Sequence, residues 1–351
     1  MERVIPLSSL PGRRRALLIP ALLLTTVLGL SACGGGGGAE SDSGSASGAG
    51  AASDATVTIA RSSWIGFLPL DLAVEKGFFK DHGVDVTVTS FESKADSRAA
   101  LIAGEVQGIA TTIDTQVMSA AQGVDMSVPL VLDTSYGGDG LVGKKDITSF
   151  SDLKGRTVAL DTTGGASFFW FNYELKENGM TMDDVNVTSM SSGDAGSAFI
   201  AGQVDAAMTW EPWLSKAKET DFGHVILDSK DAPGIILDTL GFSKDFVTEN
   251  PEAVQGIVDG WFDALDYLKA NQDDAVSIMA DASGLSVADL TGELAGIQFY
   301  TRAENAELFG TTQAPGDLFN VAETASKLWA ENGLTDREAD VSALLDPSFV
   351  Q

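Results

Sequence analysis

Two short segments carry side chains that suit the binding of a small molecule. Trp210-Glu-Pro-Trp213 places two indoles around one carboxylate, and aromatic faces can bracket an apolar or cationic group. Thr162–Ser167 holds Gly164 and Gly165 just before an expected helix, where backbone N–H groups can turn toward an anion. Each segment has a structural alternative, since an indole can fill a core and a Gly-Gly pair can simply make a tight turn. We therefore treat both as candidate binding loops.

Acidic side chains are a second group of candidates. Asp114 and Asp139 follow predicted strands and could meet an amine, although either could equally be a cap or turn residue. The chain has 50 acidic and 22 basic residues and a net charge of −28. Such a charge repels nucleic acid and anionic lipid and keeps a protein in solution. We expect no nucleic-acid partner.

Catalytic chemistry finds little support in the sequence. His82 and His224 fall in short polar turns, so a Ser-His-Asp triad has no evident histidine. No His/Cys/Asp spacing suggests zinc, and no DxDxDG calcium loop is present. Cys33 is the single cysteine. We expect binding without catalysis, with no catalytic residue, no cofactor and no metal site.

The elements that would position these residues occur twice along the chain. Three pairs of segments resemble each other in the same order, which favours a duplicated unit over chance. The pairs are 101–111 with 199–209, 86–90 with 185–189 and, more weakly, 56–60 with 157–161.

Each unit is predicted to form a β-α-β-α-β series. The first has strands 56–60, 84–90 and 106–111 and helices 68–80 and 94–103; the second has strands 157–161, 185–189 and 204–209 and helices 166–178 and 193–201. Pro69 suits the start of a helix, and Gly104 and Gly202 suit helix ends. Strands that alternate with helices favour a parallel sheet covered on both faces. We expect an α/β protein of two such lobes with a cleft between them.

The loops after the strands are the predicted binding site. In parallel α/β sheets, ligands bind outside the carboxyl ends of the strands. The predicted ligand-binding residues are Ser62, Ser63, Trp64, Thr112, Asp114, Asp139, Thr162, Gly164, Gly165, Ser167, Trp210 and Glu211.

The rest of the chain determines how the lobes are divided. Further strands are predicted at 127–133 and 234–240, and helices at 251–270, where apolar residues recur at helical spacing, and at 314–332. We expect the C-terminal helices to pack on lobe 1. The predicted lobe 1 is 55–142 with 232–351, lobe 2 is 143–231, and the hinge crossings lie near 140–147 and 228–240.

The N-terminal segment has the pattern of an export signal. Arg13–Arg15 precede an apolar stretch at Ala16–Leu30, which is short for a membrane-spanning helix. The stretch ends Leu30-Ser-Ala-Cys33, which resembles the lipobox of bacterial lipoproteins. The resemblance implies a signal peptide at 1–32 and a lipid on Cys33. The alternative is a buried structural cysteine after an ordinary signal.

The segment after Cys33 has the composition of a tether. Residues 34–54 are almost wholly Gly, Ser and Ala with a few acids, so they cannot bury a core. The run Gly34–Gly38 lacks the Lys-Ser/Thr ending of a phosphate-binding loop and follows no strand. We expect 33–54 to be a lipidated cysteine and a flexible linker with a reach of about 25 Å.

Four segments resemble one family of binding proteins. They are Phe67-Leu-Pro-Leu-Asp-Leu-Ala-Val-Glu-Lys-Gly-Phe-Phe79, Phe150-Ser-Asp-Leu-Lys-Gly-Arg-Thr-Val-Ala159, Val204-Asp-Ala-Ala-Met-Thr-Trp-Glu-Pro212 and Asn250-Pro-Glu252. In this order, they resemble the substrate-binding proteins of nitrate/sulfonate/taurine-type ABC importers. The resemblance implies a type II periplasmic-binding-protein-like fold, in which a two-strand hinge joins the two lobes.

The same resemblance implies a function in solute uptake. The protein would be an extracytoplasmic lipoprotein that captures a small nitrogen- or sulfur-containing organic solute between its lobes. It would deliver this solute to a membrane permease driven by an ATPase. A lipid on Cys33 would hold it, as a monomer, at the outer face of the cytoplasmic membrane.

The candidate loops depart from this family in their charge. Binders of simple oxyanions are expected to offer basic groups, yet these loops show only Arg61 among acids and aromatics. We therefore predict a ligand with an amine or another cationic or zwitterionic group, such as a taurine-like compound.

Two other functions remain open. Pyrimidine-precursor synthases of thiamine biosynthesis resemble this chain in fold, but they need a site with histidine and cysteine, which this sequence lacks. A lipoprotein that presents its ligand to a sensor would share the same features. Neighbouring permease and ATPase genes would distinguish an importer from a sensor.

Overall fold

The computed structural model describes residues 55–311 and 313–351 of the chain. The predicted signal peptide, the lipid attachment at Cys33 and the tether at 34–54 lie outside these residues. The described residues belong to one compact unit. Within them, no helix is both long and apolar enough to span a membrane.

The first sheet combines strands from both ends of the described chain. Its order is β11 (Ile297–Phe299), β4 (Met126–Ser135), β10 (Leu237–Ser243), β3 (Gly108–Thr112), β1 (Ala55–Arg61) and β2 (Val84–Ser90). β1 pairs in parallel with β2 and β3, whereas β10 runs antiparallel to β3 and β4. The sheet is therefore mixed, because the duplicated unit supplies its parallel part and later segments are added in the opposite direction.

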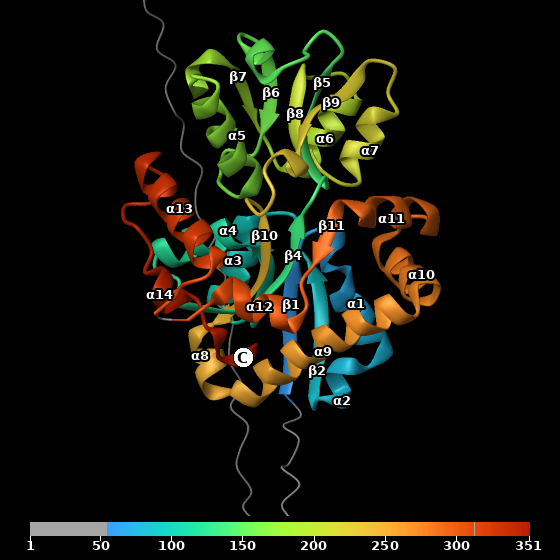
Figure 1. Cartoon of the computed structure of the whole chain (residues 1–351), viewed down its shortest axis with the longest axis vertical. Helices are drawn as coiled ribbons and strands as arrows, with labels where there is room; N and C mark the ends of the chain where they lie inside the picture. The colour runs from blue at the N-terminus through green and yellow to red at the C-terminus, as the bar shows by residue number, and fades with distance from the viewer. Residues whose placement is uncertain (1–54, 312) are drawn as a thin grey trace, which may run out of the picture. The chain divides into compact units, whose positions relative to one another are not determined.

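The second sheet has a similar arrangement. Its order is β7 (Asn186–Ser189), β6 (Thr157–Leu160), β8 (Ala206–Trp210), β5 (Asp139–Lys144) and β9 (Gly223–Asp228). β6 is parallel to β7 and β8, and β5 is antiparallel to β8 and β9. Figure 1 shows this sheet above the first one, and the chain passes between them at the β4–β5 and β9–β10 connections. We call the part built on the first sheet lobe 1 and the part built on the second lobe 2.

The duplicated unit predicted from the sequence is present in both lobes. In lobe 1, α1 and α2 lie between β1 and β2, and α3 (Lys94–Ile102) lies between β2 and β3. In lobe 2, α5 (Ala166–Glu177) and α6 (Ser192–Ile200) take the same places among β6, β7 and β8. The helix predicted over 68–80 is instead two helices, α1 (Leu68–Lys76) and α2 (Phe78–Asp81). Gly77 separates them with a φ of 80°, a left-handed conformation that ends a helix.

The first crossing between lobes lies earlier than 140–147. β4 ends at Ser135 and β5 begins at Asp139, so the chain leaves lobe 1 through 136–138, and residues 140–142 belong to lobe 2. The sequence of β5 does not predict a strand, because it contains Gly140 and Gly143, and glycine is a poor strand former. Both are required by close packing, since a Cβ on Gly140 would lie 2.8 Å from the Leu227 carbonyl and one on Gly143 would lie 2.4 Å from the Ile226 side chain. The return crossing lies between Asp228 and Leu237, within the predicted range.

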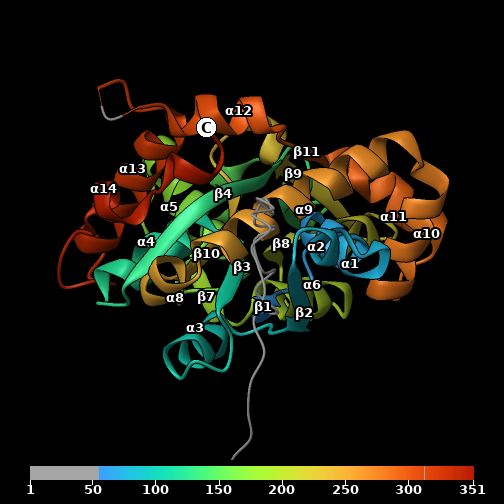
Figure 2. The ribbon, with the colours of Figure 1, turned by 90° about the horizontal axis from the view of Figure 1, so that it is seen from below.

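The C-terminal helices pack on lobe 1. α9 (Pro251–Ala270) contacts α1 and α2, and α13 (Asp317–Glu331) contacts α4 (Ile113–Ala121). Figure 2 shows α9 and α1 on one side of β4 and β10, and α4, α13 and α14 on the other. Trp261 and Trp329 are fully buried in these two layers. The remaining helices are α7 (Trp213–Lys218), α8 (Lys244–Glu249), α10 (Gln272–Ser283), α11 (Val287–Glu293), α12 (Arg302–Phe309) and α14 (Val341–Leu344).

Candidate functional site

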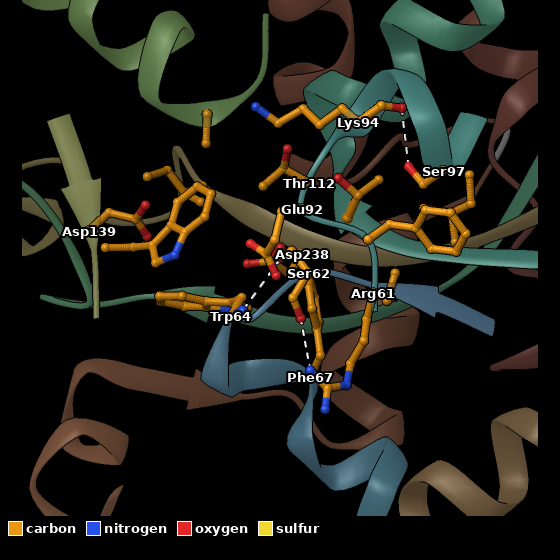
Figure 3. A pocket seen from close by; sticks show the side chains of 17 residues that line it. Arg61, Ser62, Trp64, Phe67, Glu92, Lys94, Ser97, Thr112, Asp139 and Asp238 are labelled. Atoms are coloured by element: carbon orange, nitrogen blue, oxygen red, sulfur yellow. Dashed lines mark hydrogen bonds between the residues drawn. The ribbon is translucent and has the colours of Figure 1, made fainter. Parts of the chain in front are cut away.

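A pocket lies where the ends of β1, β3 and β8 approach each other between the lobes (Figure 3). Lobe 2 contributes Asp139, Ala166 and Trp210. The other lining residues are Arg61, Ser62, Trp64, Phe67, Phe91, Glu92, Lys94, Ser97, Ile109, Ala110, Thr111, Thr112, Ile236 and Asp238. The cavity volume of the pocket is about 50 Å³. Because one water needs roughly 10–15 Å³ of such a volume, the pocket accommodates only a small solute.

Part of the predicted site lines this pocket, namely Ser62, Trp64, Thr112, Asp139 and Trp210. The loop that follows β1 carries Ser62 and Trp64, and the Trp64 backbone N–H lies 3.4 Å from the Ser62 hydroxyl. Asp139 opens β5 and pairs with Trp210 across the strands. Strand ends therefore bring these residues together, as the sequence predicted.

Two predicted residues of lobe 1 lie outside the lining. The Ser63 hydroxyl donates a hydrogen bond to Glu92, a lining residue, at 3.1 Å. Asp114 is buried in the first turn of α4, and the Trp329 indole N–H donates to its backbone carbonyl at 2.9 Å. Ser63 is exposed, whereas Asp114 is buried beside the lining residue Thr112.

The Thr162–Ser167 loop lines the pocket only through Ala166 and contacts lobe 1 through Gly164. The Gly164 carbonyl accepts a hydrogen bond from Lys94 Nζ at 2.9 Å. Gly164 and Gly165 have φ values of 108° and 93°, and an added Cβ would clash with Met118 or Lys94. The loop thus presents a carbonyl to a cation, whereas an anion site would need its N–H groups.

Thr162 and Ser167 make contacts within lobe 2. The Thr162 hydroxyl hydrogen-bonds with that of Ser189, and the Ser167 hydroxyl lies 2.9 Å from that of Ser192. These hydrogen bonds connect the loop to the end of β7 and the start of α6. Neither Thr162 nor Ser167 lines the pocket.

The Trp210-Glu-Pro-Trp213 segment is divided between the pocket and the lobe interior. Trp210 lines the pocket. Glu211 is buried and accepts hydrogen bonds from the Ser215 backbone N–H and hydroxyl, both at 2.9 Å. Trp213 lies under Lys216, whose ammonium is 4.8 Å from the indole. Only the first of the two indoles can therefore touch a ligand in this pocket.

Both basic residues of the lining are paired with carboxylates of the protein. Arg61 Nε lies 2.9 Å from Asp71 Oδ2, on the side of the pocket away from Asp139 (Figure 3). Lys94 Nζ lies 2.8 Å from Asp161 Oδ2 across the lobe boundary. Each cationic group therefore already has an anionic partner.

Asp139 and Asp238 bring two buried carboxylates to the lining. Burial raises the pKa of Asp139 to about 7, and the Glu211 and Asp114 carboxylates raise it further, against a hydrogen bond from Ser135. Burial likewise raises the pKa of Asp114 to about 6. Asp139 and Asp114 therefore stay protonated to a higher pH than an exposed aspartate does.

Asp133 and Asp238 form a second buried pair, opposite each other on β4 and β10. Burial raises the pKa of Asp133, although the Trp64 indole N–H donates to its Oδ1 at 3.2 Å. Burial and then the nearby Asp133 carboxylate raise the pKa of Asp238 well above its ordinary value. The Asp133 carboxylate therefore opposes the ionisation of Asp238, whereas a hydrogen bond from Asp238 favours the ionised form of Asp133.

Aromatic contacts hold the lobes together beside the pocket. Phe168 of α5 stacks on Trp329 of α13 at 5.9 Å between ring centroids, and Phe169 meets the same indole edge-on at 6.0 Å. With the Lys94–Asp161 pair, these contacts join lobe 2 to lobe 1 on either side of the loop at Gly164. The described arrangement is therefore one in which the lobes touch.

Sequence reasoning missed the aspartates that lie within strands. Asp133 and Asp238 occur in the matching runs Leu132-Asp-Thr134 and Leu237-Asp-Thr239. A charged residue inside an apolar strand is rarely buried without a purpose, and this signal could have found them. Lys94, Glu92 and Phe67 were also missed, and no pattern in the sequence distinguishes them.

Comparison with known proteins places the chain among binding proteins. Residues 50–282 match the model of the NMT1-like family. A putative binding protein of Brucella abortus is 28% identical over 256 residues, which cover 72% of this chain and 79% of that protein. The taurine-binding periplasmic protein of Escherichia coli K12 is 27% identical over 286 residues, which cover 78% of this chain and 86% of that protein. These relatives are named for binding, which agrees with the expectation of a binding protein over an enzyme.

Solved structures confirm the predicted fold. The periplasmic aliphatic sulphonate binding protein SsuA from Escherichia coli superimposes with a TM-score of 0.69 at 18% identity, over 85% of this chain and all of that one (100%). The periplasmic nitrate-binding protein NrtA from Synechocystis PCC 6803 gives a TM-score of 0.67 at 17% identity, over 85% and 87%. The family match spans well over half of the sequence, and the chain therefore belongs to the NMT1-like family.

Proposed function

We propose that this protein is the exported solute-binding component of an ABC importer. It captures a small nitrogen- or sulfur-containing organic solute in the pocket between its lobes. The observation that carries this proposal is a pocket whose wall comes from both lobes and whose volume suits a small molecule. Family membership and the names of the relatives support the same function.

Capture follows from contacts that a solute makes with both lobes. A ligand that touches Trp64 of lobe 1 and Trp210 of lobe 2 is bound best when the lobes are together, so it shifts their equilibrium toward closure. The crossings at 136–138 and 229–236 are the hinge in this proposal. The closed form is what a permease and its ATPase would recognise.

The membrane attachment belongs to the proposal as well. Cys33, after an export signal, would carry the lipid, and residues 34–54 would be the tether. Metabolic labelling with a radioactive fatty acid tests this attachment. Label is expected in the native chain and absent from Cys33→Ser; equal labelling of both would contradict it.

Solute capture is tested on the Cys33→Ser chain with a panel of taurine, alkanesulfonates, nitrate, amines, guanidines and pyrimidines. A bound solute is expected to raise the melting temperature by mass action and to reduce the radius of gyration in small-angle scattering. A solute that raises the melting temperature without compaction would contradict capture by lobe closure. An absence of binding across the panel would contradict the proposed solute class.

A further inference from the structure

The charges that face the pocket are unbalanced. Asp139 and Asp238 line it from different strands, with 4% and 3% of their surface exposed. Asp133, on the strand beside Asp238, is completely buried. Two carboxyl groups thus line the pocket from β5 and β10, and a third, on β4, lies beside Asp238 outside the lining.

The basic residues do not balance these carboxyl groups. Arg61 pairs with Asp71, and Lys94 pairs with Asp161 and the Gly164 carbonyl. Figure 3 shows Lys94 above Asp238 and Arg61 below it. A sulfonate or nitrate that entered would have to share one of these cationic groups with a carboxylate of the protein.

Several buried polar atoms at or near the pocket have no hydrogen-bond partner among the described residues. They include Arg61 Nε, which forms an ion pair with Asp71, as well as Asp114 Oδ2, Asp133 Oδ2 and the indole nitrogen of Trp210. Trp210 Nε1 is a donor in the pocket lining, so an acceptor on a ligand would satisfy it, whereas Asp133 Oδ2 is an acceptor outside the lining, beside Asp238.

The rest of the wall suits the body of an organic ion. Trp64, Trp210, Phe67 and Phe91 line the pocket together with Ile109. Aromatic faces attract ammonium and guanidinium groups.

We infer that the ligand of this pocket is a small organic cation, an alkylammonium or guanidinium-type ion, held by Asp139 and Asp238 at one end. This inference rests on the proposed solute-binding function and names its substrate class. The cation's N–H groups donate to the carboxylates, and its carbon atoms lie against Trp64 and Trp210. Simple sulfonates and nitrate are excluded as preferred ligands.

Proton release accompanies this binding. Burial holds the pKa of Asp139 near 7, and the groups that act on it are Ser135, Glu211, Asp114 and Lys94, together with Asp133 and Asp238, whose pKa values Asp139 raises in turn. A cation favours the ionised carboxyl groups, so protons leave as it enters, and affinity rises as the pH increases from about 5.5 to 8. An anion would instead bind best when these groups are protonated.

The experiment measures binding of methylammonium, ethylammonium and guanidinium to the Cys33→Ser chain by calorimetry at 150 mM KCl. Ethanesulfonate, nitrate, taurine and Ca²⁺ are the comparison ligands. Binding of at least one organic cation is expected, at least tenfold tighter than ethanesulfonate. Repeating the titration in two buffers of different ionisation enthalpy is expected to show proton release.

Two isosteric variants assign the site. Asp238→Asn and Asp139→Asn are each expected to weaken cation binding at least tenfold, while Asp266→Asn, the same change at an exposed position of α9, leaves it within twofold. Thermal unfolding without ligand checks the fold, and the buffer comparison on the native chain stands even if a variant fails to fold.

The outcomes separate the inference from the function on which it rests. Tight binding of ethanesulfonate, nitrate or Ca²⁺ without binding of any organic cation would overturn the inference and leave solute capture in place. Cation binding that survives both Asn variants would also overturn it, because the site would lie elsewhere on an acidic surface. Binding of neither class would contradict both the inference and the proposed function.

Discussion

Two carboxylates of lobe 2, one at the start of β5 and one just after β6, are in opposite situations beside the pocket. Asp161 of lobe 2 is neutralised across the boundary; although burial opposes its ionisation, the Lys94 ammonium and its hydrogen bond keep the pKa of Asp161 below the ordinary value. Asp139, which opens β5, has no such partner among the described residues, and burial raises its pKa to about 7. A paired carboxylate holds the lobes together, whereas an unpaired one is left for a ligand. For Asp161 and Asp139 the sign of the pKa change follows this difference, whereas at Asp71 burial outweighs the pairing with Arg61 and raises the pKa.

The contact between the lobes is expected to give the largest effect when it is broken. Trp329→Ala removes a fully buried indole, its stacking on Phe168 and Phe169, and its hydrogen bond to the Asp114 carbonyl. Loss of this packing should lower the free energy of unfolding by about 3–5 kcal/mol. Urea denaturation measures it.

A matched change clarifies that result. Trp213→Ala removes an indole that is only partly buried and lies outside the pocket lining, so its effect should be clearly smaller. Equal losses in the two variants would contradict the special role of the α5–α13 contact.

The pH dependence of the free energy of unfolding tests the unpaired carboxylate, Asp139. Without ligand, the native Asp139 keeps a proton that the unfolded chain has lost, so its stabilisation is complete below about pH 4 and is lost as the pH rises through about 7. Asp139→Asn should therefore reduce the decline in unfolding free energy between pH 5 and pH 8, by on the order of 2 kcal/mol. Denaturation at several pH values measures it, and an unchanged slope would show that Asp139 is ionised in the free protein.

Trp210→Ala tests the part of lobe 2 that faces the ligand. The indole lines the pocket opposite Asp139, so its loss should weaken solute binding at least tenfold, about 1.4 kcal/mol, without unfolding the protein. Calorimetry and a melting curve measure both. Unchanged affinity would assign Trp210 to packing alone.

Breaking the Lys94–Asp161 ion pair is expected to have the smallest effect on binding. Lys94→Met leaves Asp161 without its ammonium partner, so that it should resemble Asp139 in its raised pKa. Lobe closure should weaken by about 1 kcal/mol, because the pair is partly exposed and water can replace it. Scattering and affinity measurements would show a more open form with roughly fivefold weaker binding.

The control for this change is Lys80→Met. Lys80 pairs with Asp85 within lobe 1, and both side chains are exposed. Its removal should leave both closure and affinity unchanged. A similar loss in Lys80→Met would attribute the effect of Lys94→Met to general charge and not to the contact between lobes.

Local patterns predicted the duplicated unit because its strands and helices carry their own signals. The ranges 84–90 and 251–270 are the bounds of β2 and α9 as predicted. β5 and β9 were missed, since they become strands only by pairing with each other and, for β5, with β8. Gly140 and Gly143 serve that distant packing, which no local propensity reports.

The same limit applies to the pocket. Trp64, Thr112 and Trp210 could be predicted because they follow strands, and strand ends are where α/β proteins bind ligands. The pairing of Lys94 with Asp161 could not, since it joins residues brought together only when the lobes meet. The sequence therefore predicts where the walls are, but not which of their charges are already satisfied.

The backbone contact at the first crossing limits how the lobes can turn. Tyr136 N–H donates to the Gly296 carbonyl at 2.8 Å, and a Cβ on Gly138 would lie 3.0 Å from the same carbonyl. A rotation leaves points on its axis in place, so an opening that preserves this contact turns about a line close to Gly296. Asp139 adjoins that line and hardly moves, whereas Phe168 and Trp329 are carried apart. The carboxyl groups of the pocket are then already assembled in the open form, and the aromatic seal closes after the ligand has arrived.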